Sequence, residues 1–351
     1  MDDVSTLQAV WFLLISILWL GYFVLEGFDF GVGMLIRRVA RTDDERRAVI
    51  HSIGPIWDGN EVWLLVAGGA TFAAFPEWYA TLFSGFYLAL FLILAGLIVR
   101  GMAFELWGKR DDARWRTRWE WALVVGSLLP ALLWGVGWAN IVHGVPIDRS
   151  GEFTGTLFDL LGPYALLGGL ATLTLFLSHG ALFLELRTKG EIRARAQGIA
   201  AVTMPVAALV CIAFLGWTLV NQDGVETASA LCAAAAAAAL AAASLLASRR
   251  PGRAFAATCA AIVLVFCTLF TDLFPNAMVS STDSAFDLSL AAASSSNYTL
   301  SVMTVVAVAL VPVVLLYQGW SYWVFRHRIG PEDFGEVRTP LDLVDRRSGG
   351  G

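Results

Sequence analysis

Four carboxylates stand inside two otherwise apolar segments near the N-terminus. Glu26 and Asp29 lie in the first segment, and Asp58 and Glu61 lie in the second. The members of each pair are three positions apart, so on a helix they share one face. A carboxylate inside a membrane span costs roughly 2.5–3.5 kcal/mol on insertion scales, and such groups usually face a bundle interior or a wet path. This pattern favours groups that hold and pass protons.

The two segments must run in opposite directions if both cross a membrane. Asp29 precedes the inner edge of the first span by seven residues, roughly 10 Å of helix. Asp58 follows the inner edge of the second span by a few residues, so we expect it at a similar depth. Glu26 and Glu61 would then lie deeper, as a second step. The plainer alternative is that the carboxylates pair with arginines of the first loop or lie at headgroup level.

Other polar groups give weaker signals. Glu105 and Glu120 flank the loop after the third span, where a solvated or Arg-paired carboxylate is the plainer interpretation. Gly27 and Gly31 form a GxxxG pair, which lets a second helix approach closely. His179 is the one histidine deep in a span, and haem b in a membrane usually needs axial histidine pairs. We therefore expect hydrogen-bonded packing at His179.

The sequence contains no motif typical of a metal site or of a disulfide framework. The four cysteines occur without a CxxC motif and inside apolar stretches, so they are expected to be small buried hydrophobic residues. No HExxH, P-loop, GxSxG or dinucleotide-binding pattern occurs. The sequence predicts proton-type chemistry without a redox or hydrolytic centre in this chain, and no metal site.

The elements that carry these residues are predicted membrane spans. The chain is 57% hydrophobic and only 15% charged, too little charge for a soluble domain of 351 residues. It also lacks the basic stripe of a nucleic-acid binder. A spanning helix needs about 20 apolar residues. Nine segments meet this requirement: 9–36, 53–75, 78–99, 119–140, 160–185, 199–220, 228–248, 254–274 and 298–325.

Basic residues predict the orientation of these spans. All but Arg149 of the 24 Lys and Arg residues fall in the first, third, fifth and seventh loops or the tail. Arg100 is assigned to the third loop. Under the positive-inside rule these regions are cytoplasmic, so the N-terminus is outside and the C-terminus inside.

The predicted fold is an all-α membrane protein of about nine transmembrane helices, arranged as two four-helix bundles plus one additional helix. Residues 1–150 would form the first half, with the acidic motifs. Residues 151–280 would form the second half, and residues 281–351 the last span and a cytoplasmic tail.

Several long motifs resemble subunit II of the cytochrome bd-type quinol oxidases. They extend over nearly the whole chain, least clearly in 220–296, which looks shortened. The motifs are GFDFGVGML from Gly27, SIGPIWDGNEVW from Ser52, AGGA from Ala67, FSGFY from Phe83, RWRTRWEW from Arg114, GVP from Gly144, LRTKGE from Leu186 and the run from Thr299 to Trp323.

The resemblance implies a heterodimer with subunit I in the bacterial cytoplasmic membrane, which oxidises quinol and reduces dioxygen to water with protons from the cytoplasm. It implies two haems b and one haem d, all ligated by subunit I, and allows small single-span accessory subunits and bound lipids. Asp29 and Asp58 match family positions as proton-route residues, and Glu105 and Glu120 stand where the family commonly has acidic residues. Glu26 and Glu61 join the route from the pattern above. Trp57 and Trp63 would line a quinone, lipid or gas-access surface, or simply pack.

Two alternatives remain open. A secondary transporter could use the same carboxylates for proton coupling, although transporters often have broken spans in both halves and the acidic Gly-rich region here is confined to the first. A purely structural subunit would conduct no protons at all.

Overall fold

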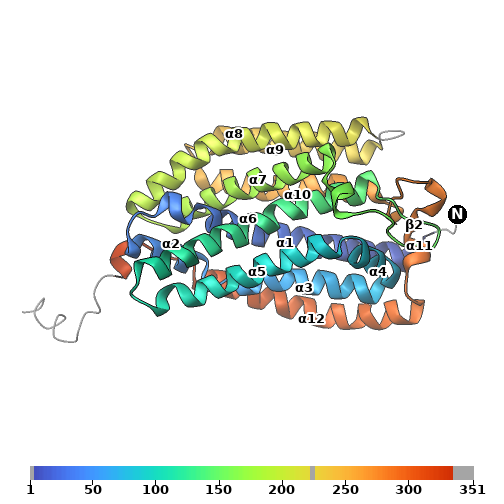
Figure 1. The fold of residues 1–351 in the computed structure, drawn as a ribbon, viewed down its shortest axis with the longest axis horizontal. Coiled ribbons are helices and arrows are strands. Elements are labelled where there is room, and N and C mark those ends of the chain that lie inside the picture. Colours follow the sequence, from blue (N-terminus) through green and yellow to red (C-terminus); the bar gives the residue numbers. More distant parts are fainter. Residues whose placement is uncertain (1–3, 222–225, 335–351) are drawn as a thin grey trace, which may run out of the picture.

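The computed structural model describes residues 4–221 and 226–334 of the chain. They form helices connected mostly by short loops (Figure 1). The α-helices are α1 (Thr6–Val39), α2 (Asp43–Ile53), α3 (Trp57–Ala74), α4 (Pro76–Gly85), α5 (Tyr87–Leu106), α6 (Ala113–His143), α7 (Pro163–Arg187), α8 (Gly190–Val220), α9 (Thr227–Leu246), α10 (Pro251–Leu273), α11 (Leu290–Ala293) and α12 (Asn297–Val324). A short antiparallel pair, β1 (Asn276–Met278) and β2 (Leu288–Ser289), lies in the loop before α12.

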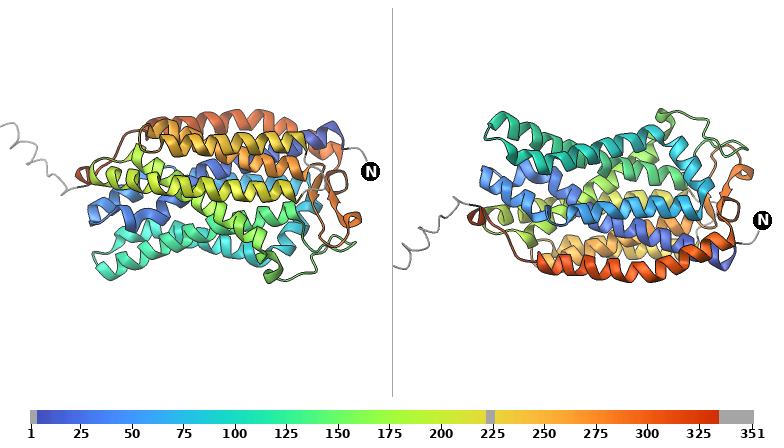
Figure 2. Two further views of the ribbon diagram at one scale, coloured as in Figure 1. Left: turned by 90° about the horizontal axis from the view of Figure 1, so that it is seen from above. Right: turned by 90° about the horizontal axis from the view of Figure 1, so that it is seen from below.

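Eight of the described helices are long and apolar enough to cross a membrane: α1, α5, α6, α7, α8, α9, α10 and α12. The shorter α3 lies alongside them (Figure 2). Its first turns carry three polar side chains, Asp58, Asn60 and Glu61. The arrangement agrees with the predicted all-α membrane fold of about nine spans, and the chain is a multi-pass membrane protein. The division into three sequence regions stays a prediction.

One predicted span is misplaced. The segment 78–99 is not one helix, because α4 ends at Gly85 and α5 runs from Tyr87 to Leu106. The apolar pattern continues across both helices, so composition alone does not reveal the break at Phe86. The shift moves Arg100 from the predicted loop into the interior of α5.

The central helix is α1, which packs against α3, α6, α7, α10 and α12. Aromatic side chains fill its contacts with α6 and α10. Phe23 stacks on Phe266 of α10 with ring centroids 4.0 Å apart, and Trp19 meets Trp138 of α6 edge-on at 5.3 Å. In contrast, α12 lies along one edge, and Leu300 is its one buried residue. The last long helix of the chain therefore packs against the first one.

The predicted GxxxG contact forms between α1 and α7. A Cβ atom built on Gly27 would meet the ring of Phe176, and one built on Gly31 would collide with the backbone of Phe176 and Gly180. Small residues let the two backbones approach this closely, as expected for packing within a membrane.

Replacing Gly31 by alanine should destabilise the protein by about 1–3 kcal/mol, because the new methyl group has backbone atoms in its way and the helices must separate. The measurement is the thermal unfolding midpoint of the purified protein in detergent. Gly216→Ala is the matched control, since nothing lies within 4 Å of a Cβ built there. Equal midpoints for the two variants would contradict the close packing of α1 on α7.

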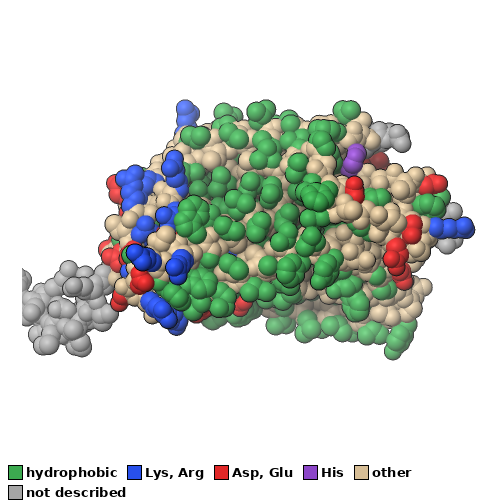
Figure 3. Space-filling view, viewed as in Figure 1, with side chains coloured by type: hydrophobic (Ala, Val, Ile, Leu, Met, Phe, Trp, Pro, Cys, Tyr) green, Lys and Arg blue, Asp and Glu red, His purple; other side chains and the backbone are tan. Residues whose placement is uncertain are grey.

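Charged side chains gather at the two ends of the molecule, with a broad apolar belt between them (Figure 3). The basic end carries α2, the α5–α6 connection and the α7–α8 turn, and the described N-terminal residues lie at the opposite end (Figures 1 and 3). We use "basic end" in this sense below.

Candidate functional site

Three helices bring four ionisable side chains together inside the first bundle. Glu26 and Asp29 of α1 and Arg100 of α5 have no exposed surface, and Glu61 of α3 is partly buried. Arg100 forms ion pairs with Glu26 and with Glu61, the latter with Nη2 and Oε2 3.2 Å apart. Asp29 interacts electrostatically with the same guanidinium. We call these four residues the acidic cluster.

The cluster holds one cation and three carboxyl groups. It is therefore electrically neutral only when two of the three carboxyls carry protons. Within an apolar bundle an uncompensated charge is expensive, so proton content and structure are coupled here. The Arg100 guanidinium keeps its own proton, because arginine is not deprotonated in proteins. It also lies over the ring of Phe30, 4.9 Å from the centroid.

Some polar atoms of the acidic cluster have no hydrogen-bond partner among the described residues. These include Oε2 of Glu26, Oδ1 of Asp29, and Nε and Nη1 of Arg100. Buried polar atoms are normally satisfied by protein groups or ordered water. Several unsatisfied atoms in one cluster are thus unusual for a purely structural ion pair, and they suit groups that accept protons or bind water.

The other oxygen of Asp29 has a defined partner. Its Oδ2 accepts a hydrogen bond from Nδ2 of Asn60 at 2.7 Å. Asn60 Oδ1 accepts bonds from Gln318 Nε2 at 3.0 Å and from the Tyr322 hydroxyl at 2.8 Å. These two residues belong to α12, so the far end of the sequence contacts the acidic cluster.

The predicted carboxylates divide into three environments. Glu26, Asp29 and Glu61 meet in the acidic cluster, whereas the spacing had paired Glu61 with Asp58. Asp58 is exposed at the start of α3, one helical turn before Glu61 and on the same face. Glu105 is exposed in the last turn of α5. Glu120 is buried, and it belongs to a different network.

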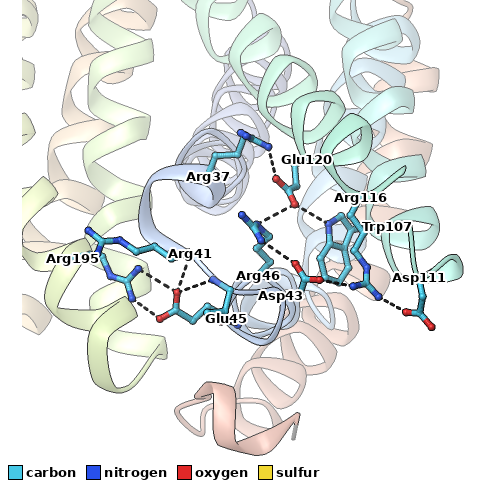
Figure 4. A network of polar contacts seen from close by, with 11 residues as sticks. Arg37, Arg41, Asp43, Glu45, Arg46, Trp107, Asp111, Arg116, Glu120 and Arg195 are labelled. Carbon is cyan, nitrogen blue, oxygen red and sulfur yellow. Dashed lines mark hydrogen bonds and ion pairs between the residues drawn. The ribbon is translucent and has the colours of Figure 1, made fainter. Parts of the chain in front are cut away.

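Glu120 is held by arginines at the basic end (Figure 4). It pairs with Arg37 and with Arg46, whose Nε lies 3.0 Å from Oε1, and it accepts a bond from Nε1 of Trp107 at 3.4 Å. Arg46 continues to Asp43 of α2 at 2.9 Å. This is the Arg-paired arrangement weighed as the plainer alternative, and for Glu120 the geometry favours it.

Glu45 connects the start of α2 to α8 in the same region (Figure 4). It caps α2 by accepting a bond from Thr42 N–H and pairs with Arg195. Burial would raise the pKa of Glu45, but hydrogen bonds from Arg195 and from the backbone of Arg41 and Thr42 outweigh it and lower the pKa. Together the Glu120 and Glu45 contacts fasten α2 across the basic end.

The ring nitrogens of His179 already have hydrogen-bond partners. His179 Nδ1 lies 2.7 Å from Thr258 Oγ1, and Nε2 lies 3.2 Å from the carbonyl oxygen of Val24, so both ring nitrogens are engaged. Its ring stacks on Phe255 with centroids 4.4 Å apart. Residues 4–221 and 226–334 contain no group of three His, Cys, Asp or Glu side chains placed to hold a metal. The predicted packing role of His179 is confirmed.

The two tryptophans of the WDGNEVW motif differ. Trp57 packs against Phe104 of α5, with ring centroids 5.0 Å apart. Trp63 contacts Gly21 and lines an apolar groove of about 580 Å³ between α1, α3, α10 and α12. Gln318 and Tyr322 lie at the same groove. Trp63 therefore borders an apolar groove, whereas Trp57 is packed beside the acidic cluster.

Sequence reasoning missed Arg100, Asn60, Gln318 and Tyr322. Arg100 was missed because the predicted span ended at residue 99. The observed helix ends at Leu106, which places Arg100 well inside it. Asn60 stands between two recognised residues, Asp58 and Glu61. Gln318 and Tyr322 are polar groups in a long apolar segment, but their contact with α3 depends on helix packing that the sequence does not display.

Comparison with known proteins gives a consistent result. The family model for cytochrome bd terminal oxidase subunit II matches residues 7–325. Cytochrome bd ubiquinol oxidase subunit 2 of Bacillus subtilis (strain 168) is 40% identical over 333 residues, covering 94% of this chain and 98% of that one. Cytochrome bd-I ubiquinol oxidase subunit 2 of Escherichia coli (strain K12) is 38% identical over 371 residues, covering 95% and 98%.

A solved structure supports the fold. The bd oxidase from Geobacillus thermodenitrificans matches with a TM-score of 0.70 at 16% identity, covering 92% of this chain and 99% of that chain. Because the family model spans most of the chain and the relatives align almost end to end, this chain belongs to the cytochrome bd terminal oxidase subunit II family.

Proposed function

We propose that this chain carries protons from the cytoplasm toward the haem-bearing subunit of a quinol:oxygen oxidoreductase. The observation that carries the proposal is the acidic cluster, in which Glu26, Asp29 and Glu61 surround the buried Arg100. The complex would oxidise quinol and reduce dioxygen to water, and consumption of cytoplasmic protons would build a membrane potential. A secondary transporter is disfavoured by membership of the oxidase family.

The proposed orientation follows from charge. Apart from Arg149, the described Lys and Arg residues belong to the basic end or, for Arg100, to the helix leading from it. Positive residues favour the cytoplasmic side of a bacterial membrane. The basic end would then face the cytoplasm, with the N-terminus outside and the C-terminus inside. Asp58 lies nearer the basic end than the acidic cluster does, so it is placed to receive protons first.

The proposed route enters at Asp58 and continues to Glu61 one turn deeper on α3. Glu61 and Glu26 share the Arg100 guanidinium, so a proton that arrives on one carboxyl changes the charge balance felt by the other. Arg100 stays protonated and holds the two carboxyls near each other. Asp29 lies on the same face of α1 as Glu26, one turn nearer the basic end, and would pass protons to Glu26. Glu105 remains a proposed entry group at the basic end, and Glu120 a proposed member that is restrained by its arginines.

Subunit I is the proposed partner on the side of α3, α5 and α12. Exposed apolar side chains such as Leu65, Leu94 and Leu316 cover these helices, and α12 is almost entirely uncovered by the rest of the chain. Because His179 is already hydrogen-bonded on both nitrogens, we assign ligation of the two haems b and the haem d to subunit I. No step in this chain involves a haem.

Lipids or a quinone tail are proposed occupants of the apolar hollows. One is the groove beside Trp63, and the other is a cavity of about 480 Å³ between α3, α4, α5 and α6. Both are lined almost entirely by apolar side chains, which suits hydrocarbon chains. Small single-span accessory subunits remain a proposal based on the family resemblance alone.

Replacing Asp58 by asparagine should lower oxygen reduction by about tenfold while haem content stays unchanged. This is less than the contribution of an obligatory proton carrier, because water at the surface can partly bypass an exposed group. The measurement is quinol-dependent oxygen uptake by the purified two-subunit oxidase, normalised to haem absorbance.

Asp44→Asn is the matched control, since Asp44 is an exposed carboxylate of α2 at the same end. Unchanged turnover in the Asp58 variant would remove Asp58 from the route. Loss of haem together with turnover would point to a structural role.

A further inference from the structure

The Asn60 amide connects Asp29 with α12. Its Nδ2 donates to Asp29 Oδ2 at 2.7 Å and lies 3.5 Å from the carbonyl oxygen of Leu25. Its Oδ1 receives two donors, Gln318 Nε2 at 3.0 Å and the Tyr322 hydroxyl at 2.8 Å. Asn60 itself has no exposed surface. The amide is therefore bonded at both ends inside the protein.

The chemistry of an amide makes this arrangement directional. An amide oxygen only accepts hydrogen bonds, and an amide nitrogen only donates them. Two donors on Oδ1 favour the orientation that presents the NH2 group to Asp29. Asp29 Oδ2 must then act as an acceptor, so a protonated Asp29 carries its proton on Oδ1. That atom has no hydrogen-bond partner among the described residues.

We propose that Gln318 and Tyr322 are positioning residues that act through Asn60 to hold Asp29 with Oδ1 as its proton-bearing oxygen. The proposal rests on the proton-carrying role of Asp29 proposed above, and it extends the site to the C-terminal helix. The two residues are four positions apart on α12 and share one face, so a single face of this helix supplies both donors.

A purely structural role is the competing explanation. Most of α12 is uncovered, and its opposite end is attached through Trp11, whose Nε1 donates to Leu300 O at 3.1 Å and to Thr304 Oγ1 at 3.0 Å. On that explanation, Gln318 and Tyr322 attach the other half of α12 in the same way. However, anchoring requires only that bonds form, whereas here both donors converge on one oxygen and set the direction of the bond to Asp29.

The test uses Tyr322→Phe, Gln318→Leu and the double variant in the intact two-subunit oxidase. Each single variant removes one of the two donors to Asn60 Oδ1, so turnover should fall about threefold for a single variant and about tenfold for the double variant. Tyr317→Phe is the matched control, because Tyr317 is exposed on the same helix. It should keep the turnover of the unmodified enzyme.

Two further readouts separate positioning from anchoring. In an Asp29→Asn background, Tyr322→Phe should cause no additional loss of turnover, because the residue being positioned is gone. In infrared difference spectra, the carboxylic C=O band that disappears in Asp29→Asn should move to higher wavenumber in Tyr322→Phe, since the bond from Asn60 to Oδ2 weakens.

The outcomes distinguish the two proposals. A lower unfolding temperature with unchanged turnover and an unchanged band would show that α12 is merely anchored, and would overturn the positioning role. Absence of any band that depends on Asp29 would overturn it as well. If Asp29→Asn leaves turnover intact, the proton-carrying role fails, whereas a shifted band would still establish that Gln318 and Tyr322 orient the carboxyl.

Discussion

Replacing Arg100 by methionine should destabilise the folded oxidase by about 3–5 kcal/mol, the usual loss when one partner of a buried ion pair is removed. Methionine fills a similar volume but leaves Glu26 and Glu61 without their cation. Both carboxyls would have to become neutral or attract water into the bundle. We expect a lower unfolding temperature and, at physiological temperature, less assembled oxidase in the membrane.

The measurement is the temperature at which the purified complex loses its haem absorbance. Arg110→Met is the matched control, because Arg110 is exposed in the α5–α6 connection and lies over Trp115. A second variant identifies the cause: Arg100→Met combined with Glu26→Gln and Glu61→Gln removes the unpaired charges. It should recover most of the stability but not the turnover, because its carboxyls can no longer take up protons. A single Arg100 variant as stable as the unmodified protein would show that the ion pairs are unimportant for folding.

The pairing of carboxylates within each of the two helices could be predicted from the sequence. Glu26 and Asp29 sit one turn apart in an apolar helix, and Asp58 and Glu61 do the same in the next, so the period of the helix alone places each pair on one face. The Gly27 and Gly31 contact follows from the same kind of reasoning, because small residues four apart favour a close neighbour in a membrane. Local spacing is sufficient to predict a shared helix face for each carboxylate pair and a close-packing face for the two glycines.

The place of Arg100 in the acidic cluster could not be predicted in this way. The apolar run that includes α4 and α5 gives no sign of the break at Phe86, and a span that ends at residue 99, seven residues before Leu106, leaves Arg100 in a loop. Likewise, the partners of Glu120 follow from the position of α2, which folds back across the basic end and presents Arg46. Both features depend on where helices end, which is the least certain property of a predicted span.

The contribution of α12 depends on contacts between distant parts of the chain. Asn60 and Tyr322 are 262 positions apart, and the apolar pattern of α12 does not say which of its faces meets α3. Polar residues in a span do indicate that such a contact exists, because a side-chain amide or hydroxyl in hydrocarbon needs a partner. Gln318 and Tyr322 could have been recognised as polar groups in need of a partner, but the partner itself could not be identified.

Replacing Asp29 by asparagine should lower oxygen reduction by about a hundredfold, the lower end of what a positioned proton-transfer group contributes. The variant should keep its haems and its stability. Asp29 stands between Gly27 and Gly31 in the sequence, but the structure separates the carboxyl from the helix contact. Gly27 and Gly31 face Phe176 and Gly180 of α7, whereas Asp29 bonds to Asn60 of α3. An isosteric change at Asp29 therefore leaves the α1–α7 contact untouched.

The measurement combines steady-state oxygen uptake with the single-turnover reaction of the reduced enzyme with dioxygen. In the variant, the steps that take up protons should slow, while steps that precede proton uptake keep their rates. Asp29→Glu offers a second comparison, since it restores a titratable carboxyl with one added methylene and should recover part of the activity. Equal slowing of every step would instead indicate a general distortion. Asp29 is oriented by the neutral Asn60 amide, whereas Glu26 and Glu61 form ion pairs with Arg100. A change at Asp29 should therefore separate proton delivery from electrostatic support of the fold more cleanly than a change at Glu26 or Glu61.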